Sequence, residues 1–281
     1  MSDIKDILKD AGFKFDKRLG QNFITDANLL RAIVADSGLE RGAVAVEIGA
    51  GAGTLTRELA KVAGRVISYE VDESLKPVLF ATLAGLENVE LRFYDILKRN
   101  LEEEEKSFGG QYFLIANLPY YITTPLIMAF LEKSKLLKSM TVMVQREVAD
   151  RLCAKPGGKD YGSLTVAVDF RGGAKVVRHV SRAMFHPMPN VDSAVVRIDI
   201  ERGKYPVEDE ALFIKLCRDA FSMRRKTLLN NLLSSFNISR EAAQDAIQKA
   251  GFSPDIRGEK LSASDFARLA NVLFYTLNKN I

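Results

Sequence analysis

The chain is poor in the residues that carry metal, redox and disulfide chemistry. Its 281 residues include two cysteines, two histidines and no tryptophan. Cys153 and Cys217 lie far apart and form no CxxC pair, so we expect reduced thiols and no disulfide framework. His179 and His186 have no ligand-like spacing with either cysteine, so we expect no metal site.

Long apolar runs are also missing. No run reaches the length that a membrane-spanning helix needs. The first residues, Met1 to Asp6, have neither the apolar core of a secretory signal nor the composition of a transit peptide. Hydrophobic residues still make up 47% of the chain, enough for a sizeable core. We therefore expect a soluble, cytoplasmic protein with no membrane partner.

Apolar runs alternate with helical patterns through the first half of the chain. Strands are predicted at 44–48, 65–69, 89–93, 112–116 and 140–144, and helices at 54–63, 73–84 and 124–133. Such alternation is typical of βαβ units in a parallel sheet. Residues 163–170 and 194–200 are predicted to form two further strands, an antiparallel pair at one edge of that sheet. The predicted fold class is therefore α/β with a Rossmann-like sheet.

The pattern changes near residue 203. Helical periodicity follows at 208–221, 225–236, 240–250 and 263–275. We therefore expect two domains, 1–203 and 204–281, of which the second is small and all-α. Residues 1–140 carry a net charge of −2 and residues 141–281 a net charge of +6. This bias suits a polyanion-binding surface, although ordinary solvated charge gives the same totals.

A glycine-rich turn follows the first predicted strand. Gly49, Gly51 and Gly53 come after Glu47 at alternate positions, which lets the backbone pass close to a ligand before a helix begins. A dinucleotide site would have the spacing G-x-G-x-x-G, and NAD remains the alternative on this motif alone. The G-x-G-x-G spacing after an acid is typical of S-adenosylmethionine-dependent methyltransferases.

Two carboxylates follow the next two predicted strands. Glu70 could accept hydrogen bonds from both ribose hydroxyls of a nucleoside cofactor, and Asp95 could accept from its adenine amino group. A helix cap or a surface acid is the simpler interpretation of each. Because ligands of open α/β sheets bind at the carboxyl ends of the strands, the three strand ends together predict one site.

The tetrad Asn117-Leu118-Pro119-Tyr120 follows the fourth predicted strand. The Asn117 amide oxygen and the Leu118 carbonyl can both accept from an exocyclic NH₂ group. Pro119 restricts the turn, and Tyr120 offers a face on which a base can stack. An ordinary turn after a strand is the alternative. The tetrad resembles that of RNA adenine-N6 methyltransferases.

Three more segments carry a resemblance that covers most of the chain. These segments are Lys17–Asp26, which contains Gln21-Asn22-Phe23, Phe185–Ser193, and Ala220–Leu228. Together with the glycine turn and the tetrad, they resemble the ribosomal RNA adenine-N6,N6-dimethyltransferases, most closely the bacterial branch that modifies two adjacent adenosines near the 3′ end of 16S rRNA.

The resemblance implies a class I methyltransferase fold that binds S-adenosylmethionine. It assigns contacts with the cofactor to Asn22, Ile24, Gly49, Gly51, Glu70, Asp95 and Asn117. It assigns the catalytic pocket to Asn117, Leu118, Pro119, Tyr120 and Phe185, with Tyr120 and Phe185 on either side of the target base. It also implies a monomer that acts on the immature small ribosomal subunit.

Several cations along the chain are candidate phosphate contacts, although a solvated surface charge is the alternative for each one. The strongest group is Arg224, Arg225 and Lys226, together with Arg146. Further candidates are Lys14, Lys17, Arg18, Arg151, Lys155 and Lys159. Two other functions share these motifs: a resistance methyltransferase acting on 23S rRNA, and a non-catalytic assembly or transcription factor.

Overall fold

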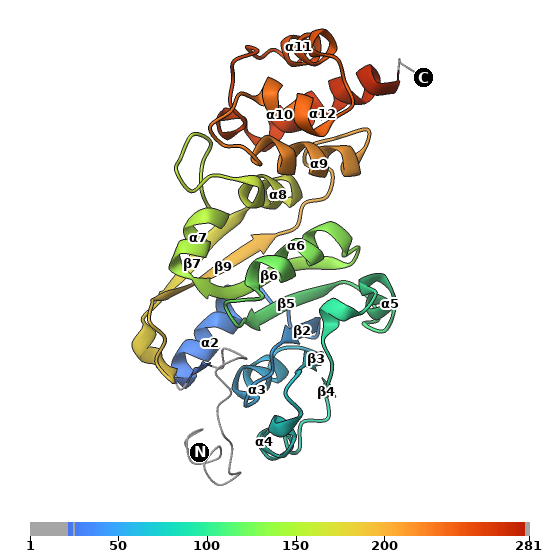
Figure 1. Ribbon diagram of the computed structural model, residues 1–281. Coiled ribbons are helices and arrows are strands. Elements are labelled where there is room, and N and C mark those ends of the chain that lie inside the picture. Colours follow the sequence, from blue (N-terminus) through green and yellow to red (C-terminus); the bar gives the residue numbers. More distant parts are fainter. Residues whose placement is uncertain (1–21, 25, 279–281) are drawn as a thin grey trace. The chain divides into compact units, whose positions relative to one another are not determined.

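A computed structural model describes residues 22–24 and 26–278. These residues divide into two compact units (Figure 1). The first comprises residues 22–149 and 175–200, and the second comprises residues 150–174 and 201–278. The last crossing between the units lies near the expected boundary at residue 203, but residues 150–174 group with the C-terminal helices.

A seven-stranded sheet forms the centre of the first unit (Figure 1). Its strands are β2 (Val44–Ile48), β3 (Arg65–Tyr69), β4 (Val89–Arg92), β5 (Tyr112–Asn117), β6 (Leu137–Gln145), β7 (Ala174–Val180) and β9 (Ser193–Asp199). Their order across the sheet is β4-β3-β2-β5-β6-β9-β7. The first five pair in parallel, whereas β9 runs antiparallel to β6. The predicted parallel strands are confirmed.

Helices α3 (Thr54–Ala60), α4 (Lys76–Thr82), α5 (Leu101–Lys106) and α6 (Thr123–Lys133) join the parallel strands, with the short 3₁₀ turns η2 (Glu73–Leu75) and η3 (Ile96–Lys98). Helix α2 (Ala27–Asp36) precedes β2, α7 (Arg146–Leu152) follows β6, and the 3₁₀ turn η4 (Arg182–Met184) follows β7. The middle strands are almost continuously buried: Ala45 and Val46 in β2 and Leu114 and Ile115 in β5 have no exposed surface. This burial on both faces is characteristic of a parallel sheet covered by helices.

The prediction of a strand at residues 163–170 is wrong. Ser163–Arg171 forms helix α8, and the antiparallel edge is made by β9 with β6, next to β7. Leu164, Val166, Val168 and Phe170 alternate along the sequence as strand residues do, and all four are buried. Because α8 is enclosed on more than one side, its apolar residues do not follow a one-sided helical pattern.

Four further helices form the second unit with α8. They are α9 (Glu210–Ala220), α10 (Leu228–Ser235), α11 (Arg240–Lys249) and α12 (Ala263–Asn278), with a 3₁₀ turn η5 (Gly258–Lys260). Phe170 of α8 stacks on Phe213 of α9, with ring centroids 4.0 Å apart. Both belong to the same buried cluster as Phe266 of α12. The predicted all-α C-terminal region is confirmed. In the described ranges, no helix is both long and apolar enough to cross a bilayer.

Candidate active site

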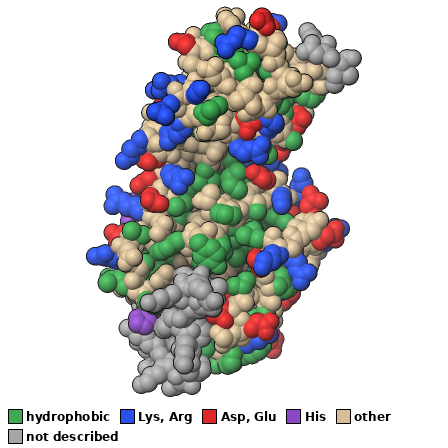
Figure 2. Space-filling view, in the orientation of Figure 1, with side chains coloured by type: hydrophobic (Ala, Val, Ile, Leu, Met, Phe, Trp, Pro, Cys, Tyr) green, Lys and Arg blue, Asp and Glu red, His purple; other side chains and the backbone are tan. Residues whose placement is uncertain are grey.

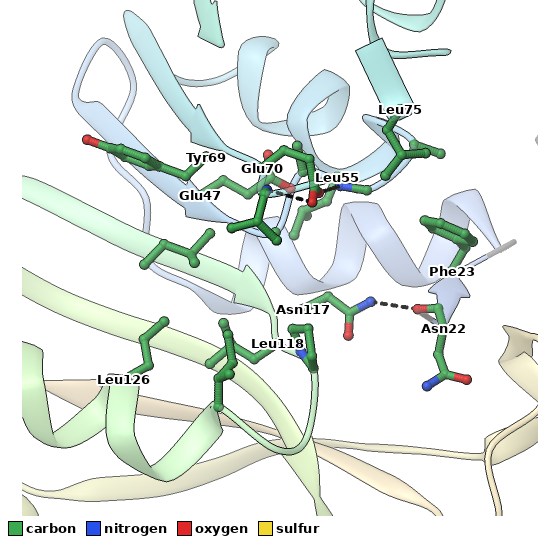
Figure 3. Close-up of a pocket in the computed structure, with 18 of the residues that line it drawn as sticks. Asn22, Phe23, Glu47, Leu55, Tyr69, Glu70, Leu75, Asn117, Leu118 and Leu126 are labelled. Atoms are coloured by element: carbon green, nitrogen blue, oxygen red, sulfur yellow. Dashed lines mark hydrogen bonds between the residues drawn. The ribbon is translucent and has the colours of Figure 1, made fainter. Parts of the chain in front are cut away.

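A cavity of about 520 Å³ lies in the first unit at the carboxyl ends of β2, β3 and β5 (Figure 3). All residues predicted to contact the cofactor or the target base line it: Asn22, Ile24, Gly49, Gly51, Glu70, Asp95, Asn117, Leu118, Pro119, Tyr120 and Phe185. The structure thus brings together residues from separate segments of the chain.

The glycine turn follows β2 directly. Gly49, Gly51 and Gly53 have φ angles of 81°, 56° and 79°, which other residues adopt only with strain. The Tyr69 carbonyl accepts the N–H groups of Gly49 and Ala50, at 2.8 and 3.0 Å. A Cβ atom on Gly51 would lie 2.8 Å from Cε1 of Phe23. The turn therefore needs glycine both for its backbone angles and for its approach to this ring.

The Glu70 carboxylate, at the end of β3, is already hydrogen-bonded to backbone. Its Oε2 accepts the Gly51 N–H at 2.8 Å, and its Oε1 accepts the N–H groups of Val71 and Asp72, at 2.8 and 2.9 Å. Burial raises the pKa of this carboxyl above its ordinary value, while the three N–H donors oppose the rise. Glu70 therefore also ties the glycine turn to the neighbouring strand.

A second carboxyl, Glu47, lies beneath the turn and also lines the cavity. Its Oε2 accepts hydrogen bonds from the Thr56 hydroxyl at 2.5 Å and the Ser68 hydroxyl at 2.7 Å. Burial raises its pKa to about 8, and the charge of Glu70 adds to the rise. At neutral pH Glu47 is therefore mainly protonated, and the cavity contains one fewer negative charge than the sequence suggests.

Asp95 caps the 3₁₀ turn η3. Its Oδ1 accepts the Leu97 N–H at 3.0 Å, and its Oδ2 lies 3.7 Å from Nζ of Lys98. The cap that the sequence offered as the simpler interpretation is therefore present, on a residue that also lines the cavity.

Asn117 ends β5 with its amide directed across the cavity (Figure 3). Its Nδ2 donates to the Asn22 carbonyl at 3.1 Å, which leaves Oδ1 as the acceptor that the amide can offer a ligand. A Cβ atom on Gly49 would lie 3.8 Å from the Asn117 carbonyl oxygen. The side-chain amide is thus oriented by the backbone just before β1 (Phe23–Ile24), and the backbone of Asn117 lies close to the glycine turn.

Tyr120 is held by a residue from a distant part of the sequence. Its hydroxyl lies 3.0 Å from Oγ of Ser193, the first residue of β9. Ser193 is buried and pairs with Gln145 of β6. A tight turn follows Pro119, because its carbonyl accepts the Ile122 N–H at 3.2 Å. The orientation of the Tyr120 ring therefore depends on strand β9 as well as on its own turn.

Phe185 is positioned at the cavity by a small, two-stranded second sheet. Strand β1 pairs antiparallel with β8 (Phe185–His186), with Ile24 opposite Phe185. Phe185 is 5% exposed and belongs to the same buried cluster as Ile24, Leu30 and Val195. This pairing joins the segment predicted to hold the cofactor to the segment predicted to hold the base.

Three residues of the site could not be given a role from the sequence. Ser193 is the last residue of the Phe185–Ser193 segment, but nothing in its spacing indicates a bond with Tyr120. Glu47 is recognisable in the sequence only as an acid before the glycine turn. Tyr121 also lines the cavity and is 58% exposed; its position directly after the tetrad is the signal that could have identified it.

The candidate phosphate contacts that the structure describes lie outside the cavity. Arg224, Arg225 and Lys226 are exposed in a turn before α10, although the sequence predicted a helix from residue 225 onwards. Arg146 lies at the start of α7. Lys14, Lys17 and Arg18 fall outside the described residues.

Arg224 has structural contacts as well. Its guanidinium donates to the carbonyls of Lys159 and Tyr161, at 3.0 and 3.2 Å, and lies 3.8 Å from a Glu259 carboxylate oxygen. This brings the loop with Lys155 and Lys159, both exposed, next to the turn. Figure 2 shows Lys and Arg side chains, in blue, gathered at the left of the second unit. Among the described residues, no group of three His, Cys, Asp or Glu side chains could hold a metal ion.

Known proteins are similar to this sequence over nearly its whole length. The pattern of the family described as ribosomal RNA adenine dimethylase matches residues 12–274. A ribosomal RNA small subunit methyltransferase A from Geobacillus thermodenitrificans is 46% identical over 277 residues, covering 96% of this chain and 94% of that protein. A protein of the same name from Clostridioides difficile is 42% identical over 272 residues, with the same coverage.

Solved structures share the fold. The crystal structure of a dimethyladenosine transferase from Plasmodium falciparum superposes with a TM-score of 0.78 at 25% identity, over 92% of this chain and 98% of that one. That of the 23S rRNA methyltransferase ErmE gives a TM-score of 0.67 at 26% identity, over 90% and 99%. With its sheet, its cavity and these relatives, the chain belongs to the ribosomal RNA adenine dimethylase family.

Proposed function

We propose that this protein uses S-adenosylmethionine to dimethylate N6 of two adjacent adenosines in the 3′-terminal hairpin of 16S rRNA, during assembly of the small subunit. Relatives named small subunit methyltransferase A, at 42–46% identity across almost the full chain, support this choice of substrate. The observation that carries the proposal is one cavity that combines the glycine turn, two strand-end acids and the Asn117 amide.

The cavity fits the cofactor in size and chemistry. Its volume lies within the range of about 300–1,000 Å³ that is usual for small-molecule sites. Asn22, Ile24, Gly49 and Gly51 would line the amino-acid part, Glu70 would accept from ribose hydroxyls, and Asp95 would accept from the adenine amino group. When bound, S-adenosylmethionine supplies an electrophilic methyl group on a sulfonium.

Asn117 and Leu118 would hold the reacting amine. The N6 lone pair of adenine is delocalised into the ring, which makes the amine a poor nucleophile. Oδ1 of Asn117 and the Leu118 carbonyl would accept its two hydrogens and favour a more tetrahedral nitrogen whose lone pair faces the methyl group. Orientation of this kind contributes up to roughly 7–11 kcal/mol in well-aligned systems.

Tyr120 and Phe185 would replace the stacking that the base loses when it leaves the RNA. A base within folded RNA reaches such a cavity only when it is flipped out or already unpaired. The Ser193 contact fixes the Tyr120 ring before substrate arrives. Because the methylated amine loses its proton readily, the mechanism needs no general base.

The helical C-terminal region would bind RNA. We propose that the catalytic function belongs to residues 1–203 and that the helical region 204–281, with Arg225 and Lys226, contacts phosphates of the small subunit. Arg146 would add a contact from the first unit. Because 16S rRNA is assembled in the cytoplasm, the protein would work there. It would act as a monomer.

The test is methyl transfer to unmethylated small subunits, followed by mass spectrometry of the 16S rRNA. Wild-type protein should yield two dimethyladenosines, and Asn117→Ala should lower turnover by about 10²-fold or more with a much smaller change in cofactor affinity. Near-normal turnover of the folded variant would show that Asn117 is only a turn residue. Cofactor titration of the wild type separates an enzyme from a non-catalytic scaffold.

A further inference from the structure

Large hydrophobic side chains stand out on the wall of the cavity. Among the described residues, three exposed large hydrophobic side chains line the cavity: Val71, Leu97 and Tyr121. Val71 and Leu97 follow Glu70 and Asp95, at the end proposed for the cofactor. Tyr121 follows Tyr120, at the end proposed for the target base, and it is the aromatic member of the three.

The two adjacent tyrosines have different surroundings. Tyr120 is bonded to Ser193, whereas Tyr121 is 58% exposed. Among the described residues, no hydrogen bond or ring contact to the Tyr121 side chain is present. Its backbone is fixed, because Ile122 N–H and the Thr123 hydroxyl both donate to the Pro119 carbonyl, each at 3.2 Å. A rigid turn therefore presents a solvent-facing ring beside the pocket for the base.

We propose that Tyr121 is a second stacking platform, which binds the nucleotide adjacent to the target adenosine. The proposal rests on the function proposed above. A nucleotide next to a flipped base loses one stacking partner, so an aromatic ring at the cavity mouth gains most by covering that face. Stacking tolerates any base, so Tyr121 would hold the strand while Tyr120 and Asn117 select the adenine.

Steady-state kinetics on unmethylated small subunits can test this role. Tyr121→Ala should raise KM about 5- to 100-fold with little change in kcat, because stacking on one base is lost while the reacting amine stays held. Tyr121→Phe should behave like the wild type. Phe80→Ala is the matched control, since Phe80 is 61% exposed on α4 and does not line the cavity.

Three results would overturn the proposal. One is an unchanged KM for Tyr121→Ala, and another is an equal defect in Tyr121→Phe, which would assign the effect to the hydroxyl. The third is an equal loss of S-adenosylmethionine affinity, which would place Tyr121 on the cofactor.

A binding experiment separates this proposal from the proposed function. The probe is a hexaribonucleotide with 2-aminopurine beside a single adenosine, whose fluorescence is quenched by stacking. Quenching by the wild type and Tyr121→Phe, but not by Tyr121→Ala, is expected even if small subunits prove to be the wrong substrate. Equal quenching by all three would refute the platform whatever the substrate is.

Discussion

At the scale of single residues, Glu70 has two tasks that compete for the same oxygens. It accepts three backbone N–H groups and is also proposed to accept from ribose hydroxyls. A carboxylate offers about four lone-pair sites. Contacts with both ribose hydroxyls, as proposed, would therefore require Glu70 to release one of its backbone N–H donors or to accept two donors at one lone pair.

Glu70→Gln should therefore weaken S-adenosylmethionine binding by about 10- to 100-fold, since a hydrogen bond to a charged acceptor contributes roughly 1.5–3 kcal/mol. Calorimetric titration measures the change. Glu73→Gln is the control, because that acid lies three residues further on with a side chain 68% exposed. Equal affinities for wild type and Glu70→Gln would remove Glu70 from the cofactor site.

Glu47 makes stability depend on pH. Its pKa is raised by burial from 4.5 to about 8, so the folded protein binds a proton that the unfolded chain releases. The resulting stabilisation is complete below about pH 4.5 and is lost as the pH rises through about 8. Glu70 and the hydroxyls of Thr56 and Ser68 face this carboxyl.

Glu47→Gln should therefore melt at a higher temperature than the wild type at about pH 9, and the difference should shrink or reverse at about pH 5. Comparing the two proteins across that range isolates Glu47, because both retain Glu70. A pH-independent difference would show that Glu47 is ionised throughout.

At the scale of elements, the bond from Tyr120 to Ser193 joins two motifs 73 residues apart. Tyr120→Phe and Ser193→Ala should each slow methyl transfer, and the double variant should be little worse than either. The expected coupling is about 0.5–1.5 kcal/mol, as for a typical hydrogen bond. Ser139→Ala, another buried serine in the neighbouring strand β6, controls for the loss of a buried hydroxyl. Additive effects would show that the contact does not position the ring.

The basic turn before α10 gives a separate prediction. Arg225→Ala with Lys226→Ala should weaken binding to small subunits and reduce the salt slope by about 1 for each phosphate that is no longer neutralised. Arg224 is left intact because it supports the loop at Lys159. The control is Arg240→Ala with Lys249→Ala, which removes the same charge from α11. If this pair weakens small-subunit binding equally, only the net charge of the protein matters.

Sequence patterns were sufficient to predict those strands and helices whose own residues show the periodicity that their burial in the fold requires. The strands from β2 to β6 have apolar runs, and Glu70, Asp95 and Asn117 each lie at or just after the end of one. Helix α8 could not be predicted, because its alternating apolar residues, among them Val166 and Phe170, are buried by helices distant in sequence. The β1–β8 pair and the Ser193 bond are likewise long-range contacts of very short segments, for which periodicity gives no signal.

At the scale of the whole molecule, recognition should depend on an assembled RNA surface. The proposed cavity contacts would select an adenine and hold its neighbour whatever the base, whereas the basic turn can respond only to phosphate spacing. Small subunits should therefore be methylated in preference to large subunits and to a free 3′-terminal hairpin, in assays across a salt series. Preference for large subunits would favour the 23S resistance function, and equal activity on the hairpin would show that no assembled surface is required.

The position of β9 has a consequence for synthesis of the chain. β9 lies between β6 and β7, although both of those strands precede it in the sequence. A nascent chain that has emerged only as far as β7 leaves the edge of β6 unpaired, and Met140, Val142 and Val144 of that strand are fully buried in the finished protein. Such an edge is prone to aggregate. Translation past Asp199 closes it, so pauses between β7 and β9 should increase the need for chaperones.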